Sequence, residues 1–161
     1  MQLESVTGAT PEERLEALGL ALPPVPEAVA DYVTHTQIGS IIYTSGMLPW
    51  VAGDLQFTGL MGAELTLEQG YQAFQLSALN GLALLRDITG DLSRIKRIHR
   101  IEGTGGATPD FVDMLLALNG ASHLVNTVFA ERGAHSGMIY SNLSMPIDCA
   151  TLVVFWTVIE A

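Results

Sequence analysis

The sequence is poor in cysteine and contains no long apolar run. Its single cysteine, Cys149, excludes an intrachain disulfide and is typical of a reducing compartment. The most apolar stretch, ATLVVFWTVI, has ten residues, too few to cross a membrane as a helix. The first 20 residues lack the basic start and apolar run of a signal peptide. We therefore expect a cytoplasmic protein that does not bind a membrane.

Basic side chains are scarce as well. Seven Lys and Arg stand against 17 Asp and Glu, a formal net charge of −10. Nucleic-acid binding depends on basic side chains that neutralise phosphates, so this balance argues against a nucleic-acid partner. Four of the seven cations crowd into the segment SRIKRIHR, namely Arg94, Lys96, Arg97 and Arg100. This cluster is typical of a solvated strand edge, and an anion-binding patch is the alternative interpretation.

The usual cofactor and metal motifs are missing. No GxGxxG, P-loop, HExxH or GxSxG pattern occurs. The histidines, at positions 35, 99, 123 and 135, are too scattered for metal-ligand spacing, and one cysteine cannot build a thiolate site. The glycine run GTGG, residues 103–106, favours a flexible strand-to-helix turn, with an anion cradle as the alternative. We predict neither a metal nor a cofactor.

Apolar side chains, in contrast, are abundant. They make up 48% of the 161 residues, the charged share is only 15%, and the mean hydropathy is +0.34. A chain of this length fits one domain with a substantial core. Such a domain leaves apolar surface to cover, and large exposed apolar patches mark contact sites. We therefore expect an oligomer.

The first 28 residues are predicted to form an arm on a single domain that spans residues 29–161. Residues 11–20 favour a short helix that begins at Pro11 and ends near Gly19. The segment LPPVPEA then favours an extended connector, because closely spaced prolines adopt polyproline II geometry.

The pattern of the domain predicts an α+β fold. Two segments rich in β-branched residues flank Gly39–Ser40 and predict a hairpin. A helix is predicted over 66–90, with Thr66 and Gln69 in capping-box spacing, and a second over 108–133. Strands are predicted near 94–105 and after Gly133. The last strand is apolar on both faces, which predicts a central position or contact with a partner.

Some polar residues stand out along these elements. His135 and Ser136 follow a predicted helix, where loops often hold functional groups, and histidine titrates near neutrality without help. Asn119 lies beside the apolar stripe of its helix and needs partners if it is half-buried. Tyr32 and Ser45 are placed on the two strands of the predicted hairpin.

The motifs YTSGMLP, LSALNGLALL, LNGASHLV and AHS resemble, in order and spacing, those of the RidA/YjgF family, also called L-PSP-like proteins. The resemblance covers about residues 28–161, and the arm is similar to that of a longer subgroup. It implies a chorismate-mutase-like fold, with a mixed sheet of about six strands and two helices on one face. It also implies a homotrimer whose intersubunit clefts hydrolyse enamines or imines to a keto acid and ammonia, without a metal or cofactor.

Position by position, the resemblance places the family's tyrosine, two serines and asparagine on Tyr32, Ser45, Ser136 and Asn119. The arginine that clamps the substrate carboxylate falls on His135, and the glutamate that positions water falls on Ala150. Met47 replaces a common glutamine. Histidine does not reproduce a bidentate arginine–carboxylate pair, so an altered substrate specificity is expected.

These observations lead to three hypotheses. In the first, a small enamine or imine is hydrolysed, with catalytic residues His135, Tyr32 and Ser45. Its substrate-binding residues are Asn119, Ser136, Met47 and Tyr140. In the second, the same cleft hosts a different reaction centred on His135. In the third, the trimer binds a small ligand and performs no chemistry.

Overall fold

The computed structural model describes residues 6–160, so residues 1–5 of the predicted arm and residue 161 lie outside the described part. Helices and strands follow in this order: α1 (Pro11–Ala17), β1 (His35–Ile38), β2 (Ile41–Thr44), β3 (Trp50–Val51), β4 (Asp54–Leu55), α2 (Leu67–Thr89), β5 (Ile95–Gly106), α3 (Met114–Phe129), β6 (Ser136–Asn142) and β7 (Thr151–Ile159). Short 3-10 turns η1 (Leu92–Arg94), η2 (Ala130–Gly133) and η3 (Pro146–Asp148) lie between them.

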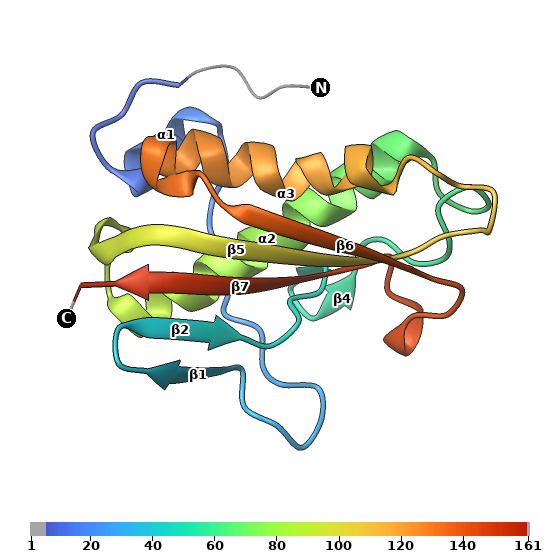
Figure 1. Ribbon diagram of the computed structural model, residues 1–161, viewed down its shortest axis with the longest axis horizontal. Coiled ribbons are helices and arrows are strands. Elements are labelled where there is room, and N and C mark those ends of the chain that lie inside the picture. The colour runs from blue at the N-terminus through green and yellow to red at the C-terminus, as the bar shows by residue number, and fades with distance from the viewer. Residues whose placement is uncertain (1–5, 161) are drawn as a thin grey trace.

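The main sheet has five strands in the order β1-β2-β7-β5-β6, and β3 and β4 form a separate two-stranded ribbon (Figure 1). Only β5 and β6 pair in parallel, so the sheet is mixed. The predicted α+β fold is confirmed, with five strands plus two in place of one sheet of about six. The last strand, β7, lies at the centre of the sheet, which explains why it is apolar on both faces.

Both long helices lie on one face of the main sheet (Figure 1). Thr66 caps α2 in a complete capping box with Gln69, and Gly90 ends the helix in the left-handed region with φ 77°. The predicted bounds of this helix are therefore confirmed to within one residue, because both of its ends are determined by residues next to them in the sequence.

The predicted bounds of the second helix are wrong at both ends. Thr108 does not cap it, because the Thr108 backbone N–H donates to Met61 O at 3.0 Å and holds the chain away from helical geometry. The helix begins only at Met114. It stops at Phe129, because Ala130 adopts φ 52°, and Gly133 belongs to the turn that follows.

Small residues allow the helices and the sheet to approach closely. An added Cβ at Gly120 of α3 would lie 1.9 Å from Tyr71 O of α2. Likewise, Cβ atoms at Gly103 and Gly105 of β5 would collide with side chains of the two helices. The run 103–106 is therefore part of a buried strand, which corrects its interpretation as a flexible turn.

The predicted arm helix is present as α1, and it packs on the domain. Leu15 is buried in the main core. Arg14 Nη1 donates to Val128 O at 2.9 Å, and the Leu92 N–H donates to Glu12 Oε1 at 2.8 Å. Two hydrogen bonds and one buried leucine thus attach the arm to α3 and η1. No helix within residues 6–160 is long and apolar enough to cross a membrane.

Candidate functional site

The face of the main sheet opposite α2 and α3, called the open face below, is not covered by any helix within the described residues (Figure 1). Gly103 and Gly105 face the helices, so the alternating side chains Arg100, Glu102 and Thr104 point to the open face. Half-buried Tyr43 and Trp156, with ring centroids 5.2 Å apart, extend this face across β2 and β7.

An ion pair lies on the polar part of the open face. Arg100 Nε donates to Glu102 Oε1 at 2.7 Å, and the two side chains are 28% and 25% exposed. The guanidinium also lies 5.8 Å from the ring centroid of Trp156. Within residues 6–160, nothing accepts a hydrogen bond from the two terminal nitrogens of Arg100. This guanidinium therefore keeps its bidentate donor pair available.

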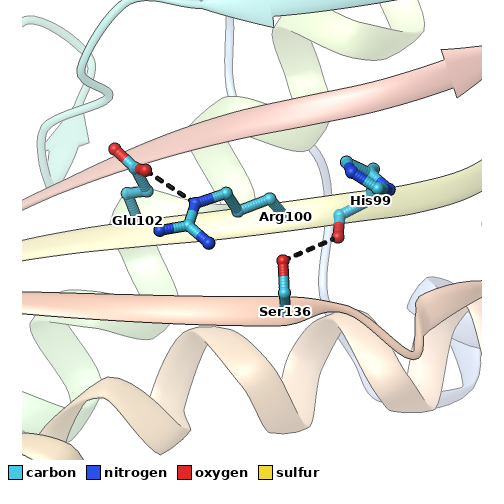
Figure 2. Close-up of polar contacts among 4 residues, drawn as sticks. All are labelled: His99, Arg100, Glu102 and Ser136. Carbon is cyan, nitrogen blue, oxygen red and sulfur yellow. Dashed lines mark hydrogen bonds and ion pairs between the residues drawn. The ribbon is translucent and has the colours of Figure 1, made fainter.

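Ser136 lies on the strand next to this ion pair (Figure 2). Its Cα is paired with that of Arg100 in the parallel register of β5 and β6, and its hydroxyl donates to His99 O at 3.3 Å. Met138 and Tyr140 follow at alternate positions opposite Glu102 and Thr104, and both are exposed. Two predicted binding residues, Ser136 and Tyr140, thus share one face with an arginine and a carboxylate.

His135 points to the other side of the sheet. Its Nδ1–H donates to Gly133 O at 2.6 Å, and the Ser122 hydroxyl of α3 lies 3.1 Å from Nε2. Since a carbonyl only accepts, Nδ1 carries a proton, and Nε2 accepts from Ser122 when the ring is neutral. Both ring nitrogens are engaged within the chain, and they attach the start of β6 to α3.

Asn119 is half-buried on α3, one turn before Ser122. No described residue forms a hydrogen bond with its side-chain amide. It belongs to the same edge of the molecule as β6.

Tyr32, Ser45 and Met47 lie together at the opposite edge, where they line a shallow cleft. Tyr32 is 47% exposed, whereas Met47 is buried and exchanges two backbone hydrogen bonds with Val153. The Ser45 hydroxyl donates to Val33 O at 2.6 Å. The prediction that Tyr32 and Ser45 lie on the two hairpin strands is wrong, because β1 begins after Tyr32 and β2 ends before Ser45.

One chain does not bring the predicted residues into a single site. Three strand spacings separate β2 from β6, which amounts to about 14 Å. Tyr32, Ser45 and Met47 therefore lie on one side, and His135, Ser136 and Tyr140 on the other.

The position that the resemblance assigned to the missing glutamate is unsuited to a site. Ala150 is fully buried, and its N–H donates to Phe57 O at 3.0 Å. The nearest carboxylate in the sequence, Asp148, lies in η3 with φ 61° and is not on a strand with Ala150. The carboxylate on the open face is instead Glu102, which the sequence interpretation missed.

Glu102 was missed, and Arg100 was named only as part of the cation cluster, for a geometric reason. The cation cluster was interpreted as a solvated edge, whereas β5 is an inner strand. Two register shifts, Ile95/Arg97 and Ile98/Arg100, break the alternation of β5, so buried isoleucines recur every third residue. From Arg100 onward, buried and less buried side chains alternate regularly along β5. This alternation was the signal in the sequence that could have placed Arg100 and Glu102 on one face.

Two further observations concern a cysteine nucleophile and a metal site. Burial raises the pKa of the Cys149 thiol to about 11, so it is not a nucleophile at neutral pH. Among residues 6–160, no three His, Cys, Asp or Glu side chains gather in a way that would hold a metal ion.

The fold and the site together define a class: an α+β domain with an uncovered sheet face and polar groups divided between its two edges. The family described as "YjgF/chorismate mutase-like, putative endoribonuclease" matches residues 12–159. The chain belongs to this family, as its resemblance to RidA/YjgF proteins predicted.

Individual relatives agree with this assignment. Protein TCP17 of Trypanosoma cruzi is 31% identical over 140 residues, 86% of this chain and 88% of that protein. A crystal structure from Shewanella oneidensis, described as a "putative endoribonuclease", is 41% identical with a TM-score of 0.91, covering 93% of this chain and 99% of that one. A protein of unknown function from Agrobacterium tumefaciens is 34% identical with a TM-score of 0.87, covering 94% of each chain.

Proposed function

We propose that three copies of the chain assemble around shared clefts, and that each cleft hydrolyses a small imine or enamine that carries a carboxylate. The observation that carries this proposal is the Arg100–Glu102 ion pair beside Ser136 on the open face. The resemblance places the family's arginine and glutamate at positions that hold His135 and Ala150 in this chain. The Arg100–Glu102 pair supplies a guanidinium and a carboxylate in their place.

Assembly follows from the distribution of the candidate residues. The two groups lie at opposite edges of one sheet, so a cleft that contains both needs the β1–β2 edge of one copy and the β6 edge of another. Half-buried aromatic side chains on the open face and exposed Met138 and Tyr140 on β6 are apolar surface that such contact would cover. A closed ring of head-to-tail contacts repeats the same cleft at each interface.

In this proposal, Arg100 binds the substrate carboxylate through its two terminal nitrogens, while its Nε stays bonded to Glu102. The Ser136 hydroxyl turns from His99 O to the substrate and donates its one hydrogen bond there. Glu102 accepts a proton from water as the water oxygen bonds to the imine carbon. The proton passes to the nitrogen, the C–N bond breaks, and a keto acid and ammonia leave.

The neighbouring copy contributes Tyr32 and Ser45, which orient the imine, and Met47 and Tyr140 form apolar walls. Asn119 binds a polar group of the substrate. His135, whose ring nitrogens are both engaged, holds the start of β6 in place. Its catalytic role as a replacement for the arginine is the competing hypothesis, and the same assay tests it.

The test is imine hydrolysis. An amino-acid oxidase generates the imine, and the release of keto acid is timed with and without the protein. We expect Arg100→Met to lower kcat/KM by about 10- to 150-fold, the value of about 1.5–3 kcal/mol for a hydrogen bond to a charged group. Glu102→Gln should lower kcat by about 100-fold. Arg97→Met, an exposed arginine on the same strand, is the matched control and should retain activity.

Subunit mixing tests the shared cleft. Arg100→Met and Tyr32→Phe are each expected to be impaired. Refolding the two variants together in equal amounts should restore activity in about one cleft in four, because random assembly places both native residues in that share of the interfaces. Absence of imine hydrolysis by the native protein would contradict the assignment, and so would full activity of Arg100→Met. A loss of activity in His135→Ala while Arg100→Met and Glu102→Gln stay active would favour the competing hypothesis instead.

A further inference from the structure

A separate groove of about 400 Å³ lies beneath the proline-rich connector. Residues 23–29 form one side, and Trp50, Ala52 and Gly53 of the β3–β4 ribbon form the other. Its volume falls in the range of small-molecule sites. The groove adjoins the cleft of Tyr32 and Ser45 but contains neither of them.

A buried amide lies in the lining of this groove. Asn80 of α2 is only 1% exposed, and it is the one buried residue among those that line the groove. Its Nδ2 donates to Trp50 O at 2.9 Å, Leu76 O at 3.1 Å and Leu48 O at 3.2 Å. Because all three acceptors are backbone carbonyls, the orientation of the amide is determined.

The other atom of this amide has no partner. No group within residues 6–160 donates a hydrogen bond to Asn80 Oδ1. Among the described residues, Thr157 Oγ1 is the one fully buried side-chain atom without a partner, so Asn80 Oδ1 is not fully enclosed by the chain. It is an acceptor of determined orientation in the lining of the groove, where a ligand can donate to it.

The walls define the rest of the ligand. The half-exposed Trp50 and the prolines of residues 23–29 present apolar surfaces that suit a planar ring. The only charged side chain in the lining is Glu27, and no Lys or Arg contributes. An anion is therefore disfavoured, in contrast to the Arg100 site.

We propose that this groove binds an uncharged, planar heteroaromatic compound whose ring N–H donates to Asn80 Oδ1. The groove shares residues 26–29 and Trp50 with the cleft of Tyr32 and Ser45, but none of the residues assigned to the reaction lines it. The proposal therefore does not depend on that reaction.

Indole is the probe, and 1-methylindole, which has nearly the same shape but no N–H, is the matched ligand. The chain has two tryptophans, so two side-chain N–H signals appear in a ¹⁵N-correlated NMR spectrum, and Trp156→Phe assigns them. We expect indole to shift the Trp50 signal saturably, with a Kd of about 1 mM. 1-Methylindole should bind about tenfold more weakly, because it cannot donate to Asn80. Anionic indole-3-carboxylate should bind more weakly than indole.

A variant that fills the groove completes the test. Val25 lines the groove but not the cleft of Tyr32 and Ser45, and it is exposed, so Val25→Phe is expected to fold normally and to weaken indole binding at least about tenfold. Ala63→Phe, at an exposed turn outside the groove, is the control and should leave binding unchanged. The proposal is overturned if indole gives no saturable shift, if 1-methylindole binds equally well, or if Val25→Phe has no effect. Imine hydrolysis measured on the same samples keeps the two proposals separate.

Discussion

Replacing Gly120 with alanine tests a close approach between the two long helices. The added Cβ would lie 1.9 Å from Tyr71 O and 2.8 Å from its carbonyl carbon, both backbone atoms of α2. Ordinary contacts between carbon atoms are about 3.5–4.0 Å, so the helices would have to separate by more than 1 Å. No side-chain rotation relieves a collision with backbone.

The expected change in the free energy of unfolding of Gly120→Ala follows from two opposing effects. Overpacking a close-packed interior costs about 1–3 kcal/mol, and contact with rigid backbone places Gly120→Ala at the upper end of that range. Alanine recovers about 1 kcal/mol because it is a better helix former than glycine. We therefore expect a loss of about 2 kcal/mol in the free energy of unfolding. For a chain of this size the Tm should fall by about 4–8 °C.

Gly70→Ala is the matched control on the partner helix. Its Cβ would meet Met61 Sδ, part of a flexible side chain that can change rotamer. We expect this variant to lie within about 1 kcal/mol of the native protein. Urea unfolding of both variants at one protein concentration gives the comparison, since association makes stability depend on concentration. If Gly120→Ala is as stable as Gly70→Ala, the proposed close contact between α2 and α3 is wrong.

Two further predictions concern buried polar side chains: Thr157 of β7 compared with Thr44 of β2, and Cys149 before β7. Thr157 Oγ1 is buried without a partner among the described residues, so Thr157→Val should raise the free energy of unfolding by about 1 kcal/mol. Thr44 Oγ1 accepts a hydrogen bond from the Phe155 N–H, so Thr44→Val should lower the free energy of unfolding by about 1–3 kcal/mol. Thermal unfolding of both variants checks this, and equal effects would contradict it. Burial raises the pKa of the Cys149 thiol from 9.0 to about 11, so labelling at pH 8 should be at least about 100-fold slower in the folded than in the unfolded protein. Because the pKa of the Cys149 thiol is higher in the folded state, its contribution to stability is present below pH 9 and is lost as the pH rises toward 11. Over this pH range the free energy of unfolding should therefore fall more in the native protein than in Cys149→Ala.

Much of the fold follows from local patterns in the sequence. Thr66, Gln69 and Gly90 define the two ends of α2 through contacts within a few residues, and the structure confirms them. The continuous apolar run of β7 predicted a central or partnered strand, and β7 is central. The bounds of α3 could not be predicted in the same way, because the hydrogen bond that delays its start comes from Met61, about 50 residues earlier.

The candidate site was predicted only in part. The resemblance of the sequence to RidA/YjgF proteins predicted four site residues, Tyr32, Ser45, Asn119 and Ser136. The structure divides these residues between opposite edges of the sheet. The shared face of Arg100 and Glu102 became clear only from the tertiary structure. Two register shifts in β5 hide the alternation that assigns side chains to faces.

The sequence by itself determined the family, the order of the elements, the helix caps and the surplus of apolar surface, since each depends on composition or on residues that are neighbours along the chain. The tertiary structure decided which strand lies inside the sheet, which side chains share a face, and that His135 and Ser136 point to opposite sides. These properties depend on pairing between segments far apart in the sequence. A one-residue change in strand register moves a side chain to the other face, and no local pattern records it.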